Sequence, residues 1–200
     1  MVEEGGARIL IDPSGHDASN FVSFGRPDVV IYTHEHMDHF NPDLAQKFAD
    51  SGVPIYANAS TAKLMKSQPN IVADGQEFDV KGVKISVHEL PHCLMANGSP
   101  GPQNSGYLIA NRLFHPGDGK ELADLKAEIL AAPIAGPDIS FKDAFDFAEQ
   151  VSAKTVVPVH YDFIGAKPEV FDVLCGDQKP FEVKIIAPGQ SIEIWFFSYT

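Results

Sequence analysis

The sequence has few cysteines, no long apolar run and no cluster of basic residues. Its two cysteines, Cys93 and Cys175, lie far apart and form no CxxC motif, which favours a reducing, cytoplasmic setting. No apolar run approaches the roughly 18–20 residues that a membrane span requires. The N-terminus is acidic and lacks the apolar segment of a signal peptide. These absences predict a soluble, cytoplasmic protein.

Basic residues are outnumbered: 15 Lys and Arg stand against 27 Asp and Glu, and the formal net charge is −12. Proteins that bind nucleic acid backbones normally present a basic face, and anionic membranes attract the same kind of surface. We therefore expect neither nucleic acid nor a membrane as a partner. A small-molecule substrate is the expected ligand.

The overall composition is that of an ordinary globular chain. Of its 200 residues, 44% are hydrophobic and 21% are charged, which excludes a disordered tail, a collagen-like fibre and a coiled coil. A chain of this length buries enough surface to fold without disulfides, and no linker or repeat divides it. We expect a single domain over residues 1–200.

Short β-branched runs alternate with amphipathic segments along the chain. Apolar runs bounded by turn residues predict strands, and a 3.6-residue periodicity with capping residues predicts helices. The expected strands cover residues 7–12, 28–33, 53–57, 77–80, 83–90, 106–110, 113–115, 129–132, 155–159, 183–187 and 192–196. The expected helices begin at Pro42 and near Ser60, cover residues 121–127 and 140–151, and begin again at Pro168. This order predicts a mixed sheet, or two sheets flanked by helices.

Two of these helices have clear boundary signals. Asn41 can cap a helix whose first residue is Pro42, and Gly52 can end it. Ser140 and Asp143 have the spacing of a capping box. These two helices are therefore the best defined of the expected elements.

One short segment, residues 33–39, carries most of the candidate chemistry. His34, His36, Asp38 and His39 follow a predicted buried strand and precede the helix at Pro42. Imidazole and carboxylate groups are the ligands that Zn²⁺ and neighbouring divalent metals prefer. Alternate residues of an extended chain point the same way, so His34 and His36 can reach one ion, and a turn can bring Asp38 and His39 to a second. The simpler alternative is a solvated, histidine-rich loop.

The pattern His34-x-His36-x-Asp38-His39 resembles the signature of the metallo-β-lactamase superfamily, and further residues match that family downstream. His92 follows the strand at 83–90, Asp118 lies in His-Pro-Gly-Asp-Gly, and His160 ends Val-Pro-Val-His. Upstream, Asp12 resembles the aspartate that supports the ligand loop. The resemblance covers residues 7 to about 195, nearly the whole chain.

This resemblance implies a fold and a ligand set. The fold would be a four-layer αββα sandwich, in which two mixed β-sheets are flanked by helices. Two divalent ions would be bound, with Zn²⁺ preferred and Mn²⁺ or Fe²⁺ as alternatives. His34, His36 and His92 would hold the first ion, Asp38, His39 and His160 the second, and Asp118 would bridge them.

The same resemblance implies a reaction. Asp-Pro near residue 12 and Val-Pro-Val-His-Tyr near residue 160 look most like the small metal-dependent hydrolase branch, which includes ascorbate-6-phosphate lactonase-like proteins. We expect a binuclear hydrolase that uses a metal-bound hydroxide on an ester, lactone, amide or phosphodiester bond. Asp38, which can orient the hydroxide, and His160 are the predicted catalytic residues.

Two other functions remain open from the sequence. A mononuclear iron, persulfide dioxygenase-like oxidoreductase keeps similar histidines. A non-catalytic metal-binding protein would use the same ligands for structure alone, although structural zinc sites are usually closed by four ligands and seven groups here leave open positions.

Several residues depart from the family pattern or lie outside it. Gly119 stands where many relatives have a hydroxyl residue, so one supporting hydrogen bond is expected to be missing. No strand is predicted before residues 7–12, and an unpaired sheet edge there would favour a homo-oligomer. The loops at 93–105 and 135–139 are the expected walls of the cleft. We expect a structural role for Cys93, and structural or supporting roles for His16, His88 and His115.

Overall fold

The computed structural model describes residues 1–15, 25–161 and 165–194, which form two mixed β-sheets. The five-stranded sheet has the order β1-β2-β3-β4-β5 and the seven-stranded sheet the order β12-β11-β10-β9-β8-β7-β6. The strands of the first sheet are β1 (Val2–Glu4), β2 (Ala7–Ile11), β3 (Val29–Tyr32), β4 (Ile55–Ala57) and β5 (Asn70–Ile71). Those of the second are β6 (Glu77–Val80), β7 (Val83–Glu89), β8 (Ser105–Ile109), β9 (Leu113–His115), β10 (Ile129–Pro133), β11 (Thr155–Val159) and β12 (Glu182–Val183).

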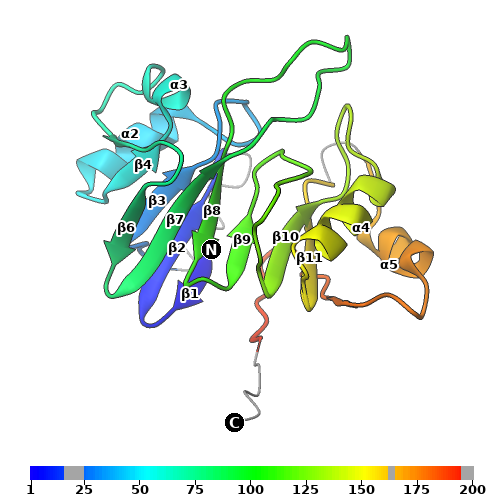
Figure 1. The fold of residues 1–200 in the computed structure, drawn as a ribbon. Helices are drawn as coiled ribbons and strands as arrows, with labels where there is room; N and C mark the ends of the chain where they lie inside the picture. Colours follow the sequence, from blue (N-terminus) through cyan, green and yellow to red (C-terminus); the bar gives the residue numbers. More distant parts are fainter. Residues whose placement is uncertain (16–24, 162–164, 195–200) are drawn as a thin grey trace.

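Helices cover the outer face of each sheet (Figure 1). Helix α2 (Pro42–Asp50) and the short α3 (Ala59–Ala62) lie with the five-stranded sheet, and α4 (Phe141–Gln150) and α5 (Pro168–Cys175) lie with the seven-stranded sheet. The expected αββα sandwich of two mixed sheets is therefore confirmed. None of the described helices is long and apolar enough to cross a membrane.

Three buried clusters account for the three contacts between these layers. Side chains alternate along a strand, so Ile9 and Ile31 face the second sheet, while Leu10 and Tyr32 face α2. The third cluster packs Phe147 and other residues of α4 and α5 against β10 and β11. Strand β3 in the middle of the five-stranded sheet is buried on both faces, which explains its continuous apolar sequence.

The predicted helix boundaries hold where the capping signals were clear. The Asn41 side chain accepts hydrogen bonds from the backbone N–H groups of Asp43 and Leu44, each at 3.0 Å. Ser140 and Asp143 form the expected capping box at the start of α4. Helix α2 fixes the direction of the chain directly after the histidine-rich segment.

Other expectations were wrong or fell short. Residues 121–127 form no helix, because Leu125 and Ala127 are drawn into the core and Asp124 takes a φ of +62°. Strand β1 pairs with β2, so the edge of β2 is not open as the sequence suggested. Of the strand expected at 183–187, only residue 183 lies in a strand, as the last residue of β12. In the strand expected at 192–196, residues 192–194 form no strand, and residues 195 and 196 lie outside the described residues.

Candidate metal centre

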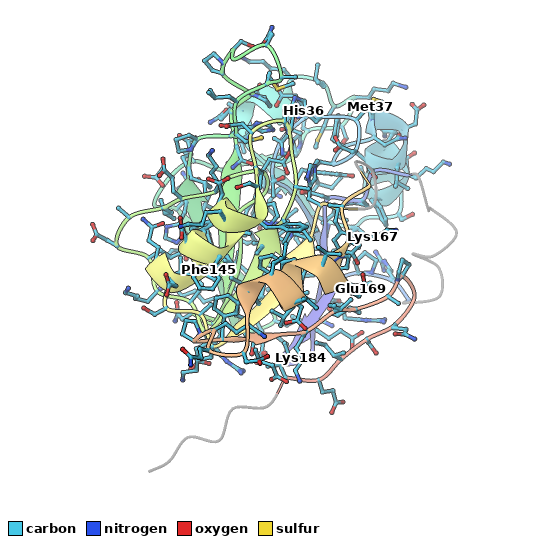
Figure 2. The ribbon with its side chains drawn as sticks, turned by 90° about the vertical axis from the view of Figure 1, so that its right-hand side faces the viewer. His36, Met37, Phe145, Lys167, Glu169 and Lys184 are labelled. Atoms are coloured by element: carbon cyan, nitrogen blue, oxygen red, sulfur yellow. The ribbon has the colours of Figure 1, made fainter. Side chains whose placement is uncertain are left out.

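All seven predicted ligands lie in loops that follow strands, and the structure brings them together in two groups. The loop after β3 supplies four of them, and the loops after β7, β9 and β11 supply one each. The first group contains His34, His36, His92 and Asp118, and the second contains Asp38, His39 and His160. In each group the candidate ligand atoms lie within 4.8 Å of one another. Figure 2 shows His36 and the exposed Met37 at the end of the molecule above α4 and α5.

The first group is arranged around three imidazole rings. The ring centroids of His34 and His36 are 4.8 Å apart, those of His36 and His92 are 4.7 Å apart, and both pairs are nearly perpendicular. Asp118 Oδ2 lies 3.4 Å from His92 Nε2 and 3.9 Å from His34 Nε2. His34, His92 and Asp118 are buried, while His36 is partly exposed.

The second group lies beside the first, and Asp118 of the first group is close to it. Asp38 Oδ2 lies 3.2 Å from His160 Nε2 and 3.9 Å from His39 Nε2. Asp118 Oδ1 is 3.2 Å from His39 Nε2, and its Oδ2 is 3.4 Å from His160 Nε2. The turn that separates the groups is closed by the His36 carbonyl, which accepts a hydrogen bond from the His39 backbone N–H at 2.9 Å. Asp118 therefore lies between the two groups.

The Nδ1 atoms of His34, His39, His92 and His160 have partners outside the groups. His92 Nδ1 donates to the Cys93 carbonyl and His160 Nδ1 to the Ala135 carbonyl, both at 2.6 Å. A carbonyl can only accept, so these Nδ1 atoms carry a proton, and Nε2 is the ring nitrogen that faces the ligand groups. Such outer partners orient histidine ligands of metal ions.

Asp12 supports two of the histidine ligands from behind, one directly and one through Thr33. Its carboxylate lies 2.8 Å from His39 Nδ1 and accepts hydrogen bonds from the Thr33 backbone N–H at 2.7 Å and the Thr33 hydroxyl at 2.6 Å. Because the Thr33 hydroxyl donates to Asp12, it can accept from His34 Nδ1, 3.0 Å away. Asp12 has a φ of +47°, an uncommon conformation for a residue other than glycine. The supporting position that the resemblance implied for Asp12 is the one it occupies.

Four buried polar atoms in the groups have no hydrogen-bond partner: Nε2 of His34, His39 and His92, and Oδ1 of Asp118. Buried polar atoms are normally paired, because an unpaired one costs free energy. Imidazole Nε2 atoms and a carboxylate oxygen that converge in this way match the ligand preferences of divalent transition metals. The residues therefore fit the metal ions that the resemblance implies.

Burial and contacts between carboxylates and imidazoles shift the pKa values of several side chains in the groups. Burial lowers the pKa of His34 to about 3, and the hydrogen bond from His160 lowers the pKa of Asp38 to about 2. Burial also acts to lower the pKa of His92, but contacts with Asp118 and with Cys93 outweigh it and raise the pKa to about 10. Protons compete with metal ions for such ligands.

Residues that sequence reasoning missed position the loop of Asp118. The Asn104 side chain donates to the Pro116 carbonyl at 2.9 Å and accepts from the Asp118 backbone N–H at 3.3 Å. Gly117 packs against it with a φ of +59°, and a Cβ there would lie 2.2 Å from Asn104 Oδ1. Asn58 is also buried and donates to the Thr33 carbonyl at 2.9 Å. In the sequence these asparagines resemble ordinary turn residues, so no signal marked them.

The remaining singled-out residues lie outside both groups. A Cβ at Gly119 would lie 2.3 Å from Leu90 Cδ1, so close packing explains the missing hydroxyl side chain. His115 accepts a hydrogen bond from the Gly117 backbone N–H at 3.3 Å, and His88 Nε2 lies 3.0 Å from the Ser86 hydroxyl. Cys93 is buried. His16 lies outside the described residues.

Comparison with known proteins agrees with this geometry. Residues 1–160 match the β-lactamase superfamily domain. The chain is 31% identical over 206 residues to a UPF0173 protein of Pyrococcus furiosus, covering 91% of this chain and 93% of that one. It is 25% identical over 167 residues to a UPF0173 metal-dependent hydrolase of Thermoplasma acidophilum, with 76% and 74% covered. The fold matches Igni18, a metallo hydrolase of Ignicoccus hospitalis, with a TM-score of 0.78, 20% identity, and 98% and 94% of the two chains covered. The chain belongs to the metallo-β-lactamase superfamily.

Proposed function

We propose that this protein is a binuclear metal-dependent hydrolase that acts on a small molecule. The observation that carries the proposal is the pair of ligand groups on either side of Asp118, with buried Nε2 atoms that lack partners. His34, His36 and His92 would hold one ion, Asp38, His39 and His160 the other, and Asp118 would contact both. Zn²⁺ suits these ligands best, with Mn²⁺ and Fe²⁺ as alternatives.

Divalent ions bound there would supply a Lewis acid and lower the pKa of water toward neutrality. The residues of the chain supply the rest. Asp38 is the more exposed of the two carboxylates, since 21% of its side chain is accessible against 4% for Asp118. A carboxylate with a depressed pKa accepts hydrogen bonds, so Asp38 can orient a water molecule toward the substrate.

His160 lies beside Asp38 and adds a second polar group to the site. Its Nε2 lies 3.2 Å from Asp38 and its Nδ1 is held by the Ala135 carbonyl, so the ring has a fixed direction. Seven ligand groups spread over two ions leave open positions, whereas structural zinc sites are usually closed by four. This difference supports catalysis over a purely structural role.

Metal analysis combined with turnover tests the proposal. The purified chain should contain about two zinc or manganese atoms per protein, as binuclear hydrolases do. A chelator should abolish turnover of an ester, lactone or phosphodiester panel, and the metal should restore it. A single iron with oxygen consumption would indicate the dioxygenase-like alternative, and no metal after reconstitution would refute the proposal.

A further inference from the structure

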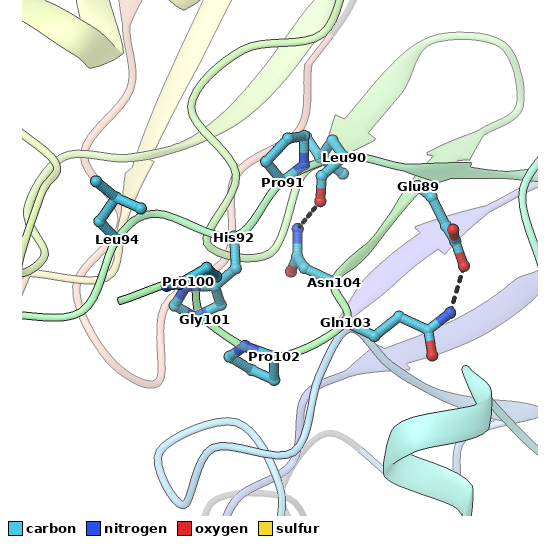
Figure 3. A pocket seen from close by; sticks show the side chains of 10 residues that line it. All are labelled: Glu89, Leu90, Pro91, His92, Leu94, Pro100, Gly101, Pro102, Gln103 and Asn104. Atoms are coloured by element: carbon cyan, nitrogen blue, oxygen red, sulfur yellow. Dashed lines mark hydrogen bonds between the residues drawn. The ribbon is translucent and has the colours of Figure 1, made fainter. Parts of the chain in front are cut away.

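The loop between β7 and β8 encloses a pocket of about 430 Å³ beside the candidate metal centre (Figure 3). Its two arms, residues 89–94 and 100–104, face each other across the pocket. The middle of the loop, residues 96–100, is exposed, while His92 and Asn104 at its ends are buried. The pocket is therefore formed by a loop whose ends belong to the site and its supports.

The lining of this pocket is mainly apolar and has one charged side chain. Leu90, Leu94 and three prolines supply the apolar surface. The charged residue is Glu89, which pairs with the amide nitrogen of Gln103. Among the described residues, no lysine or arginine lines the pocket. The Glu89 carboxylate would repel an anionic group such as a phosphate, and the described lining offers that group no lysine or arginine as a partner.

The pocket and the metal centre share His92. The Nε2 atom of this imidazole lies 3.4 Å from Asp118 in the metal centre. On its other side the ring packs against Gly101, where a Cβ would lie 2.2 Å from His92 Nδ1. Because one imidazole borders both spaces, the pocket lies directly next to the metal centre.

We propose that this pocket binds the uncharged, apolar acyl chain of a carboxylic ester or lactone. The proposal rests on the hydrolase function proposed above and narrows its substrate class. Water would add to the acyl carbonyl carbon, the bond to the alcohol oxygen would break, and the products would be the carboxylic acid and the alcohol. The formal charge of −12 adds a general preference against polyanionic substrates.

Leu94 is the residue best suited to test this proposal. Its side chain is 43% exposed, and its backbone N–H lies 3.4 Å from Asp138 Oδ2, so a new side chain need not disturb the core. Leu64 offers a matched control, because it is 54% exposed and lies outside the pocket lining. Leu94→Lys and Leu64→Lys therefore add the same charge at one site inside and one outside the pocket.

The experiment compares p-nitrophenyl acetate, butyrate and hexanoate with bis(p-nitrophenyl) phosphate on the metal-loaded protein. Each added methylene that enters an apolar pocket should raise kcat/KM about fourfold, from about 0.8 kcal/mol per methylene. Leu94→Lys should lower kcat/KM for hexanoate at least about tenfold and should flatten the dependence on chain length. Leu64→Lys should behave as the parent chain does.

A binding measurement that needs no turnover accompanies the kinetics. Calorimetry with 2-heptanone, a ketone with the hexanoyl chain that cannot be hydrolysed, should show binding that Leu94→Lys weakens and Leu64→Lys does not. Ketone binding without turnover of any substrate would support the pocket and refute the hydrolase. Turnover that favours the phosphodiester, or that ignores chain length, would refute the acyl pocket and leave the hydrolase intact.

Discussion

The two ligand groups differ in how deeply the fold encloses them. In the first group His34, His92 and Asp118 are each no more than 7% exposed, and only His36 is partly exposed. In the second group only His39 is buried, while 21% of the Asp38 side chain and 11% of the His160 side chain are accessible. Three of the four members of the first group are thus buried, against one of three in the second. We therefore expect the first group to hold its ion more rigidly.

Both groups need the two sheets docked together, but they use different strands of the seven-stranded sheet. In the first group, His34 and His36 follow β3 while His92 and Asp118 follow β7 and β9. The second adds the end of β11, where His160 takes a φ of +56°. Asp118 lies close to histidines of both groups, so substitutions can be ranked by whether they affect both groups or one.

Loss of Asp118 should have the largest effect. Asp118→Ala removes the carboxylate that faces four imidazoles, so both ions should bind poorly and kcat/KM should fall by about 10³-fold or more. Asp118→Asn, which keeps the shape, should lose activity as well and rule out a packing effect. Metal analysis and turnover measure both. The exposed Asp146→Ala serves as a control, and full metal content in Asp118→Asn would contradict the shared role.

Single-group substitutions should remove one ion each. His36→Ala should reduce the metal content by about one atom through the first group, and His160→Ala by one through the second, because a metal site that loses a ligand loses affinity. The buried first group should retain its ion better against a competing chelator than the open second group. His88→Ala, a histidine bonded to Ser86, should keep both ions. Equal chelator resistance at the two sites would contradict the expectation that the first group holds its ion more rigidly than the second.

Substitution of Asp12 should have a smaller effect on metal affinity, and it should affect both groups. Asp12→Asn weakens the support of His39 directly and of His34 through Thr33, so metal affinity should fall about 10–100-fold, as for other outer-layer substitutions. Competition with a chromogenic chelator measures the affinity of each site. A loss confined to one site would show that only one of these two contacts matters.

Much of the ligand set could be predicted because its members are close in sequence or follow predicted strands. His34, His36, Asp38 and His39 form a compact pattern at a strand end, and the end of β11 was predicted at the residue before His160. The joint placement of His92 and Asp118 came from the resemblance, since the spacing between distant strands does not indicate which of them meet.

What could not be predicted depends on contacts between distant segments. Asn104 supports Asp118 only because β8 and β9 pair, and a propensity scale cannot register that contact. The false helix at 121–127 has the same origin. Its leucines and charged residues suit a helix, but the Ala127 backbone N–H bonds to the Val151 carbonyl and the Lys126 ammonium bonds to the Gln150 carbonyl. Tertiary contacts thus override local propensity.

The smallest predicted effect concerns Lys120, which joins the loop after β9 to the loop after β10 and to the first turn of α4. Its ammonium donates to the Asp138 carbonyl at 2.8 Å and to Asp138 Oδ2 at 3.0 Å, and lies 3.6 Å from Asp143. Asp138 lies in the loop whose Ala135 carbonyl holds His160, so Lys120 supports the second group indirectly. Lys120→Met should weaken metal binding at that group less than about fivefold, because partly exposed ion pairs contribute at most about 1 kcal/mol.

Lys126→Met is the matched control for Lys120→Met. Lys126 also bridges two segments, through the Gln150 carbonyl at 2.9 Å and the Ser152 hydroxyl at 3.0 Å, but it touches no loop of the metal centre. Both variants should lose similar thermal stability, and only Lys120→Met should change the chelator resistance of the second group. Lys120→Arg should restore part of it, because the charge is kept. If the two methionine variants change metal binding equally, the Lys120 contact stabilises only the fold. The geometry of the second group would then depend on Ala135 and Asp38 and not on Lys120.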